Sequence, residues 1–166
     1  MSRILITTSS FGKDDVSPLN LLKEAGYENI INPYGRKLTE DEVLDLLLEV
    51  KPVGMIAGVE PITARVLQQA EGLKIISRCG VGVENVSLTT ARSLGIAVTN
   101  TPNAPTQAVA ELTIGLIFNL LRRISFLDRE LRKGNWTKQM GSLMRGKKVG
   151  IIGLGRIGKR VAEMLL

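Results

Sequence analysis

Short apolar runs alternate with amphipathic stretches through the first 100 residues of this chain. The β-like runs lie at residues 3–8, 30–32, 54–57, 74–78 and 96–99. Between them, apolar residues with helical spacing lie at 19–25, 43–48, 64–70 and 88–94. Strands separated by helices form βαβ units, which give a parallel sheet with helices on both faces. The alternation therefore predicts an α/β, flavodoxin-like domain over residues 1–101.

Two local signals support these helices. Thr39 precedes Glu42 by three positions, the spacing of a capping box at a helix start. Gly95 follows the segment 88–94 at the position where a left-handed backbone ends a helix.

A segment with two prolines, residues 100–105, follows the alternating region. Proline disfavours a helix before it and permits one after it, so this segment predicts a domain boundary. From Thr106, apolar residues form one broad helical face that should end near Lys133 and Gly134. We expect a single long helix, within an interdomain region of residues 102–145, that packs on another element. Its apolar face comprises Val109, Leu112, Thr113, Leu116, Ile117, Leu120, Leu121 and Ile124.

The glycines Gly153, Gly155 and Gly158 have the G-x-G-x-x-G spacing, directly after an apolar run at 149–152 that predicts a buried strand. In a dinucleotide site the first glycine makes a tight turn, the second admits the diphosphate and the third lets helix and strand pack closely. The diphosphate would lie on the amides that open a helix near Arg156. Residues 146–166 are thus predicted to begin a Rossmann domain, with a tight turn in another α/β protein as the alternative.

The net charge of +6 comes from the carboxyl-terminal part of the chain. Residues 1–121 hold 10 basic and 13 acidic residues, whereas residues 122–166 hold 12 basic and 3 acidic residues. Scattered lysine and arginine without a pattern of stacking aromatic residues favour a solvated surface, and we expect no nucleic-acid partner. A nucleic-acid interface would instead use Arg122, Arg123, Arg129, Arg132, Lys133, Lys147 and Lys148.

The single cysteine, Cys79, cannot form an internal disulfide. No stretch is apolar enough for a signal peptide or a membrane span. We therefore expect a cytoplasmic protein without a membrane partner, in which Cys79 is a small buried strand residue rather than a reactive thiol.

Several further motifs occur in order along the chain: Arg78-Cys79-Gly80-Val81-Gly82-Val83-Glu84-Asn85-Val86, Asn100-Thr101-Pro102, Val109-Ala110-Glu111-Leu112, Trp136 and then the G-x-G-x-x-G. In their order and spacing these motifs resemble the D-isomer-specific 2-hydroxyacid dehydrogenases of the phosphoglycerate dehydrogenase type. The resemblance covers nearly the whole chain and implies NAD-dependent hydride transfer between a nicotinamide cofactor and a small 2-hydroxy or 2-oxo acid; the phosphoglycerate-using type implies serine biosynthesis. NADP is not excluded, because the acidic residue expected about 20 positions after the glycines would lie beyond residue 166.

The resemblance implies that residues 1–101 bind the substrate, whose carboxylate lies on backbone N–H groups of Val81, Gly82 and Val83. Consecutive amides in a glycine-rich turn form such an anion nest, although a plain turn or β-bulge is an equal alternative without the resemblance. Arg78 is implied beside the substrate. The remaining implied contacts are Val81 and Ala108 with the nicotinamide, and Gly153, Gly155, Arg156, Ile157 and Gly158 with the diphosphate.

Three departures from the family pattern are Glu84 and Ser87, where aspartates are commoner, and Gly58, where phosphoglycerate-using members often have arginine. The loss of that arginine weakens phosphoglycerate as the substrate, because a phosphate dianion favours a guanidinium partner. Compensation by Arg78, which the resemblance places beside the cleft, is the alternative. More important, the family's catalytic histidine is absent, since the chain contains no histidine. We therefore expect an incomplete, amino-terminal portion that is inactive alone, with a non-catalytic ligand-binding module as the alternative.

The long helix and the run at 149–152 would leave large apolar side chains uncovered in such a portion. Self-association would restore their burial. We expect a homodimer with most of its contact in residues 106–166.

Overall fold

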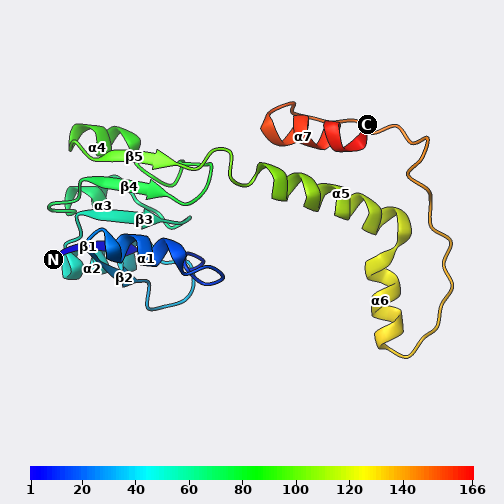
Figure 1. Ribbon diagram of the computed structural model, residues 1–166, viewed down its shortest axis with the longest axis horizontal. Coiled ribbons are helices and arrows are strands. Elements are labelled where there is room, and N and C mark those ends of the chain that lie inside the picture. Colours follow the sequence, from blue (N-terminus) through cyan, green and yellow to red (C-terminus); the bar gives the residue numbers. More distant parts are fainter. The chain divides into compact units, whose positions relative to one another are not determined.

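One parallel sheet of five strands forms the first of two units in the computed structural model, which describes residues 1–166 (Figure 1). The units are Met1–Pro102 and Asn103–Leu166. The strand order is β2-β1-β3-β4-β5, the flavodoxin-like order, so the predicted fold class is confirmed. The order changes direction between β1 and β3, where open α/β sheets bind ligands. The strands are β1 (Ser2–Ile6), β2 (Tyr27–Ile31), β3 (Gly54–Ala57), β4 (Ile75–Arg78) and β5 (Ala97–Asn100).

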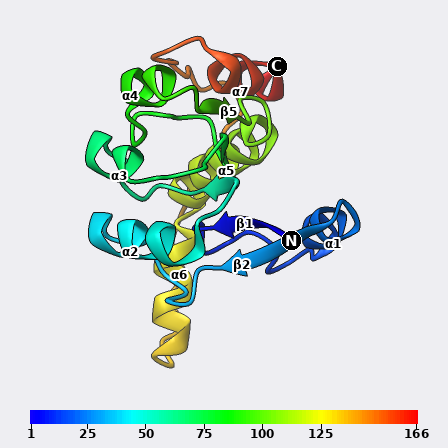
Figure 2. The same cartoon turned by 90° about the vertical axis from the view of Figure 1, so that its left-hand side faces the viewer.

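Four helices cover the sheet of this first unit. Because parallel crossovers are right-handed, the step from β1 to β2 and the steps in the opposite direction place their helices on opposite faces. Figure 2 shows α1 on one face and α2, α3 and α4 on the other. The helices are α1 (Ser17–Glu24), α2 (Glu40–Val50), α3 (Ala64–Gln68) and α4 (Leu88–Ser93).

The core of the first unit lies between the sheet and the face covered by α2, α3 and α4. Its central side chains come from alternate strand positions and from the inner faces of the helices. Fully buried examples are Leu5, Val43, Met55, Val66 and Ile76.

The predicted capping signals are confirmed. The Glu42 amide donates to Oγ1 of Thr39 at 3.3 Å, and the Thr39 amide donates to Oε2 of Glu42 at 2.8 Å. Gly95 has a φ of 70° directly after the C-cap of α4. These contacts fix where α2 begins and where α4 ends.

The second unit contains α5 (Thr106–Arg122), α6 (Ile124–Arg132) and α7 (Arg156–Leu165). The prediction of one helix from Thr106 to Lys133 is wrong, because Arg123 adopts a left-handed backbone with a φ of 55°. Asn119 Oδ1 accepts hydrogen bonds from the amide of Ser125 at 2.8 Å and from its Oγ at 2.9 Å. This side chain satisfies an amide at the start of α6, so the chain restarts a helix in a new direction.

Helices α5 and α7 pack against each other within the second unit. Ala110 and Val161 are their buried side chains, and Arg160 Nε donates to Oε1 of Gln107 at 2.6 Å. The predicted strand at 149–152 is wrong, because no segment provides a hydrogen-bonding partner for it. Ile152 is fully exposed there. None of the chain's helices has the length and apolar character that crossing a bilayer requires.

Candidate functional site

Buried polar side chains gather at the carboxyl edge of the sheet in the first unit. Thr7 follows β1 and is completely buried, Glu60 lies in the loop after β3 and is 1% exposed, and Arg78 ends β4 and is 7% exposed. Carboxyl ends of parallel strands meet at one edge, which is the ligand-binding edge of open α/β sheets. Buried polar groups require hydrogen-bond partners, so each of these side chains is fixed by its contacts.

The glycine-rich loop after β4 is anchored on its β5 side. The Gly80 amide donates to Oγ1 of Thr101 at 3.0 Å, and the Thr101 amide donates to the Gly80 carbonyl at 2.9 Å. Asn100 Nδ2 donates to the Val81 carbonyl at 2.7 Å.

The anchored loop leaves three consecutive amides free. The backbone N–H groups of Val81, Gly82 and Val83 donate no hydrogen bond within the chain. Such a run of free amides in a fixed turn is an anion-binding concavity.

Arg78 lies directly behind this loop. Its Nη1 donates to the carbonyl of Cys79, and its Nε donates to Oδ1 of Asn85 at 3.4 Å. A Cβ on Gly80 would collide with the guanidinium, and the φ of Gly80 is 151°, so only glycine fits there. None of the chain's ion pairs involves Arg78, and its positive charge therefore remains available to an anion on the loop.

Asn85 links this loop to the loop that follows β3. Its Nδ2 donates to the carbonyls of Glu60 at 2.6 Å and Gly58 at 3.2 Å, while its Oδ1 accepts from Arg78. The Glu60 carboxylate in turn accepts from the Gly58 amide at 2.7 Å and from the Thr7 hydroxyl. Sequence reasoning missed Glu60, Asn85 and Thr7, although a carboxylate three positions after an apolar strand was a visible signal.

The prediction of Cys79 as a buried strand residue is wrong. Strand β4 ends at Arg78, and the chain turns at Gly80, so Cys79 lies past the sheet and its side chain is exposed. Its amide donates to the Ala57 carbonyl at 2.8 Å, which holds the start of the loop against the end of β3.

The G-x-G-x-x-G turn lies in the second unit, and each glycine has a different structural reason. Gly153 has a φ of 91°. A Cβ on Gly158 would collide with the Gly153 carbonyl oxygen, whereas a Cβ on Gly155 would meet no atom within 4 Å. The turn thus needs glycine at its first and last positions and is open at the middle one.

Gly155 is the N-cap of α7, and the first intrahelical bond runs from Lys159 to its carbonyl at 2.9 Å. The preceding amides of Arg156, Ile157 and Gly158 are those that a helix start leaves unpaired. Together with the open space at Gly155, they fit a diphosphate. Ala108 lies exposed in the first turn of α5, and its contact with a nicotinamide stays a prediction.

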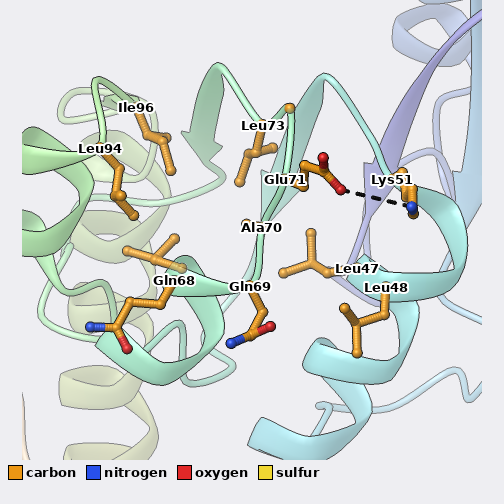
Figure 3. Close-up of a pocket in the computed structure, with 12 residues that line it drawn as sticks. Leu47, Leu48, Lys51, Gln68, Gln69, Ala70, Glu71, Leu73, Leu94 and Ile96 are labelled. Atoms are coloured by element: carbon orange, nitrogen blue, oxygen red, sulfur yellow. Dashed lines mark ion pairs between the residues drawn. The ribbon is translucent and has the colours of Figure 1, made fainter.

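A cavity of about 400 Å³ lies at the opposite, amino edge of the sheet, among α2, α3 and the segments preceding β4 and β5 (Figure 3). Leu47, Leu67 and Leu73 line it, and the Lys51 Nζ lies 3.8 Å from Oε2 of Glu71. This exposed ion pair offers little binding energy. The cavity is separate from the free amides, which follow the carboxyl end of β4.

Comparison with known proteins gives one consistent result. Residues 5–158 match the family profile described as D-isomer specific 2-hydroxyacid dehydrogenase, catalytic domain. The chain is 35% identical over 147 residues to D-3-phosphoglycerate dehydrogenase of Methanocaldococcus jannaschii, covering 87% of this chain and 27% of that protein. It is 37% identical over 131 residues to hydroxypyruvate reductase of Thermotoga maritima, covering 78% of this chain and 42% of that protein.

Solved structures give the same result. The TT0316 protein from Thermus thermophilus superposes with a TM-score of 0.87 at 36% identity, over 98% of this chain and 52% of that one. NAD+-bound 3-phosphoglycerate dehydrogenase of Entamoeba histolytica superposes with a TM-score of 0.75 at 27% identity, over 99% and 50% of the two chains. The chain therefore spans about half the length of these structures.

Proposed function

The chain belongs to the D-isomer specific 2-hydroxyacid dehydrogenase family, and we propose that it supplies the substrate-binding loop and the start of the NAD site of such an oxidoreductase. The substrate is a small 2-hydroxy or 2-oxo acid, the class of substrate that the family description names. A bound nicotinamide would accept or donate the hydride at the carbon next to the substrate carboxylate.

The free amides of Val81, Gly82 and Val83, with the buried Arg78 guanidinium behind them, carry this proposal. A carboxylate presents several acceptor sites and a negative charge, which match the amides and the guanidinium respectively. The loop therefore binds and orients the acid through its carboxylate. This placement leaves the reacting carbon outside the loop.

The turn at Gly153, Gly155 and Gly158 would hold the diphosphate on the amides of Arg156 and Ile157. We propose NAD as the cofactor, supported by the NAD+-bound relative from Entamoeba histolytica. Val81 and Ala108 are proposed as neighbours of the nicotinamide ring. The assignment of NAD rather than NADP is part of the proposal, as are a cytoplasmic location and a homodimer.

The loop is tested by titrating the isotopically labelled chain with D-glycerate and following the amide resonances of Val81, Gly82 and Val83. These resonances should shift together. Arg78→Met should weaken binding by roughly tenfold, since it removes the nearest positive charge from a partly desolvated site. Arg92→Met is the matched control, because Arg92 is exposed on α4, and it should leave the affinity unchanged. Shifts elsewhere without movement of the loop amides would contradict the proposal.

A second candidate is a ligand-binding module of the same fold without chemistry, since the free loop amides can bind an acid whether or not a hydride is transferred. Both candidates bind the acid, so binding does not separate them. Oxidation of NADH by the product of the whole gene, with hydroxypyruvate as the acceptor, would establish the oxidoreductase.

A further inference from the structure

Glu60 is a buried carboxylate beside the proposed substrate loop. It is 1% exposed, and its Oε1 accepts hydrogen bonds from the Gly58 amide at 2.7 Å and from the Thr7 hydroxyl. None of the chain's ion pairs involves Glu60. A carboxylate in such a place acts on nearby charges more strongly than an exposed one, because little water screens it.

The free amides and Glu60 follow neighbouring strands. Ala57 at the end of β3 pairs in register with Arg78 at the end of β4. Neighbouring strands lie about 4.8 Å apart, which is close to the length of a three-carbon acid. An acid held by its carboxylate on the loop after β4 can therefore reach the loop after β3 with its far end.

On the β5 side the loop is already anchored, because Asn100 Nδ2 donates to the Val81 carbonyl and Thr101 bonds to both the amide and the carbonyl of Gly80. The side toward Gly58 and Glu60 is therefore the one we consider for the far end of the acid.

The buried guanidinium at this edge, Arg78, lies behind the loop after β4, where we assign it to the substrate carboxylate, and no guanidinium is available at the end of β3. A Cβ on Gly58 would lie 2.8 Å from Oε2 of Glu60 and 3.0 Å from Cβ of Thr8, so position 58 has no room for a side chain. In the loop after β2, Arg36 already forms two hydrogen bonds with the Glu42 carboxylate, at 2.9 Å and 2.6 Å. Exposed lysines are screened by water and salt and do not offset a buried charge.

We propose that Glu60 determines the substrate class of this site: it favours 2-hydroxy and 2-oxo acids whose far end is uncharged, such as a hydroxyl, and disfavours those that end in phosphate. The inference rests on the proposed function of the Val81 to Val83 loop. Glu60 acts through its charge and through the backbone position of Gly58, and is therefore a specificity-determining residue rather than a catalytic one.

The test compares D-glycerate with D-3-phosphoglycerate, which differ only in the phosphate, by titrating the 166-residue chain and following the loop amides. The wild-type chain should bind D-glycerate at least about tenfold more tightly. Glu60→Gln keeps the size and an acceptor oxygen but removes the charge, and should reduce this preference to less than about threefold. Glu49→Gln removes the same charge from an exposed position on α2 and should leave the preference unchanged.

Equal or tighter binding of D-3-phosphoglycerate by the wild-type chain would overturn the role of Glu60 and leave the proposed function standing. An unchanged preference in a folded Glu60→Gln variant would also overturn it. If neither acid moves the loop amides of the wild-type chain, the proposed function fails, and this inference fails with it. The wild-type preference needs no variant, so the test holds even if Glu60→Gln does not fold.

Discussion

The carbonyl oxygen of Gly153 occupies the space that a Cβ on Gly158 would need. Gly158→Ala therefore forces the turn apart and should destabilise the second unit by about 1–3 kcal/mol. Urea unfolding followed by helical circular dichroism measures this loss.

Gly155→Ala is the matched control, because a Cβ there meets no atom within 4 Å and the φ of −75° suits alanine. It should change the stability by less than about 0.5 kcal/mol. NADH binding, followed by fluorescence, should nevertheless weaken, since the new methyl group would stand where the diphosphate approaches. A large loss of stability in Gly155→Ala, or none in Gly158→Ala, would contradict this account of the turn.

The Glu42 carboxylate makes the free energy of unfolding depend on pH. Hydrogen bonds from Arg36 and then from the Thr39 amide lower the pKa of Glu42 from 4.5 to about 2. A group with a depressed folded pKa contributes stability that is present above its unfolded value and is lost as the pH falls toward the folded value. The free energy of unfolding should thus fall between pH 4.5 and about 2.

Glu42→Gln should lower stability at neutral pH and should remove this part of the acid-dependent loss, because the glutamine does not titrate. Glu49→Gln, in the same helix but exposed, should keep the full acid dependence. Urea midpoints measured across the acid range test both variants. If the midpoint falls equally steeply with pH in wild type and in Glu42→Gln, Glu42 is not the group responsible for the acid-dependent loss.

The chain should show no turnover by itself. It contains no histidine, the side chain that most often donates the proton in such a reduction. NADH absorbance should stay constant with hydroxypyruvate or glyoxylate present. Oxidation above the buffer blank that depends on chain concentration would show that another residue supplies the proton.

Exposed apolar side chains of the second unit should make the chain associate. Leu112, Leu116 and Leu120 are 61%, 51% and 78% exposed on α5. Burying each such side chain gains about 1.5–3 kcal/mol. Light scattering should give twice the 18.1 kDa chain mass.

Leu116→Lys combined with Leu120→Lys should shift this association toward the monomer. Leu48→Lys, on a residue of α2 about as exposed as Leu116 (47% against 51%), should leave the association unchanged. A wild-type chain that stays monomeric at roughly tens of micromolar would rule out the dimer.

The first unit was predictable because its signals are local. Apolar periodicity located all five strands, and Thr39 with Gly95 located helix ends. The strand prediction for residues 149–152 was wrong because a strand requires a hydrogen-bonding partner, which its own residues do not encode. The helix break at Arg123 was not predicted because it depends on Asn119, four positions earlier, which caps the following helix. Spacing alone does not reveal this contact.

The candidate site was predictable only in part. Its glycines and Arg78 stand in recognisable spacings, and the free amides of the loop follow from them. The polar links were not predictable, since Asn85 bonds to residues 25 and 27 positions away and Thr7 bonds to Glu60 across 53 positions. Such partners are determined by which strands become neighbours in the sheet.

The crowding between Gly58 and Glu60 also constrains how the protein can change over generations. A basic side chain at position 58 collides with the Glu60 carboxylate, so Gly58→Arg should be unfavourable while Glu60 remains. Replacing Glu60 first by a smaller residue removes the acceptor of the Gly58 amide and the Thr7 hydroxyl, and it relieves the shortest contact at position 58, while Thr8 Cβ still lies 3.0 Å away. A lineage acquiring a phosphate-binding arginine here would therefore meet less crowding if Glu60 were lost first, and it would still need Thr8 to shift.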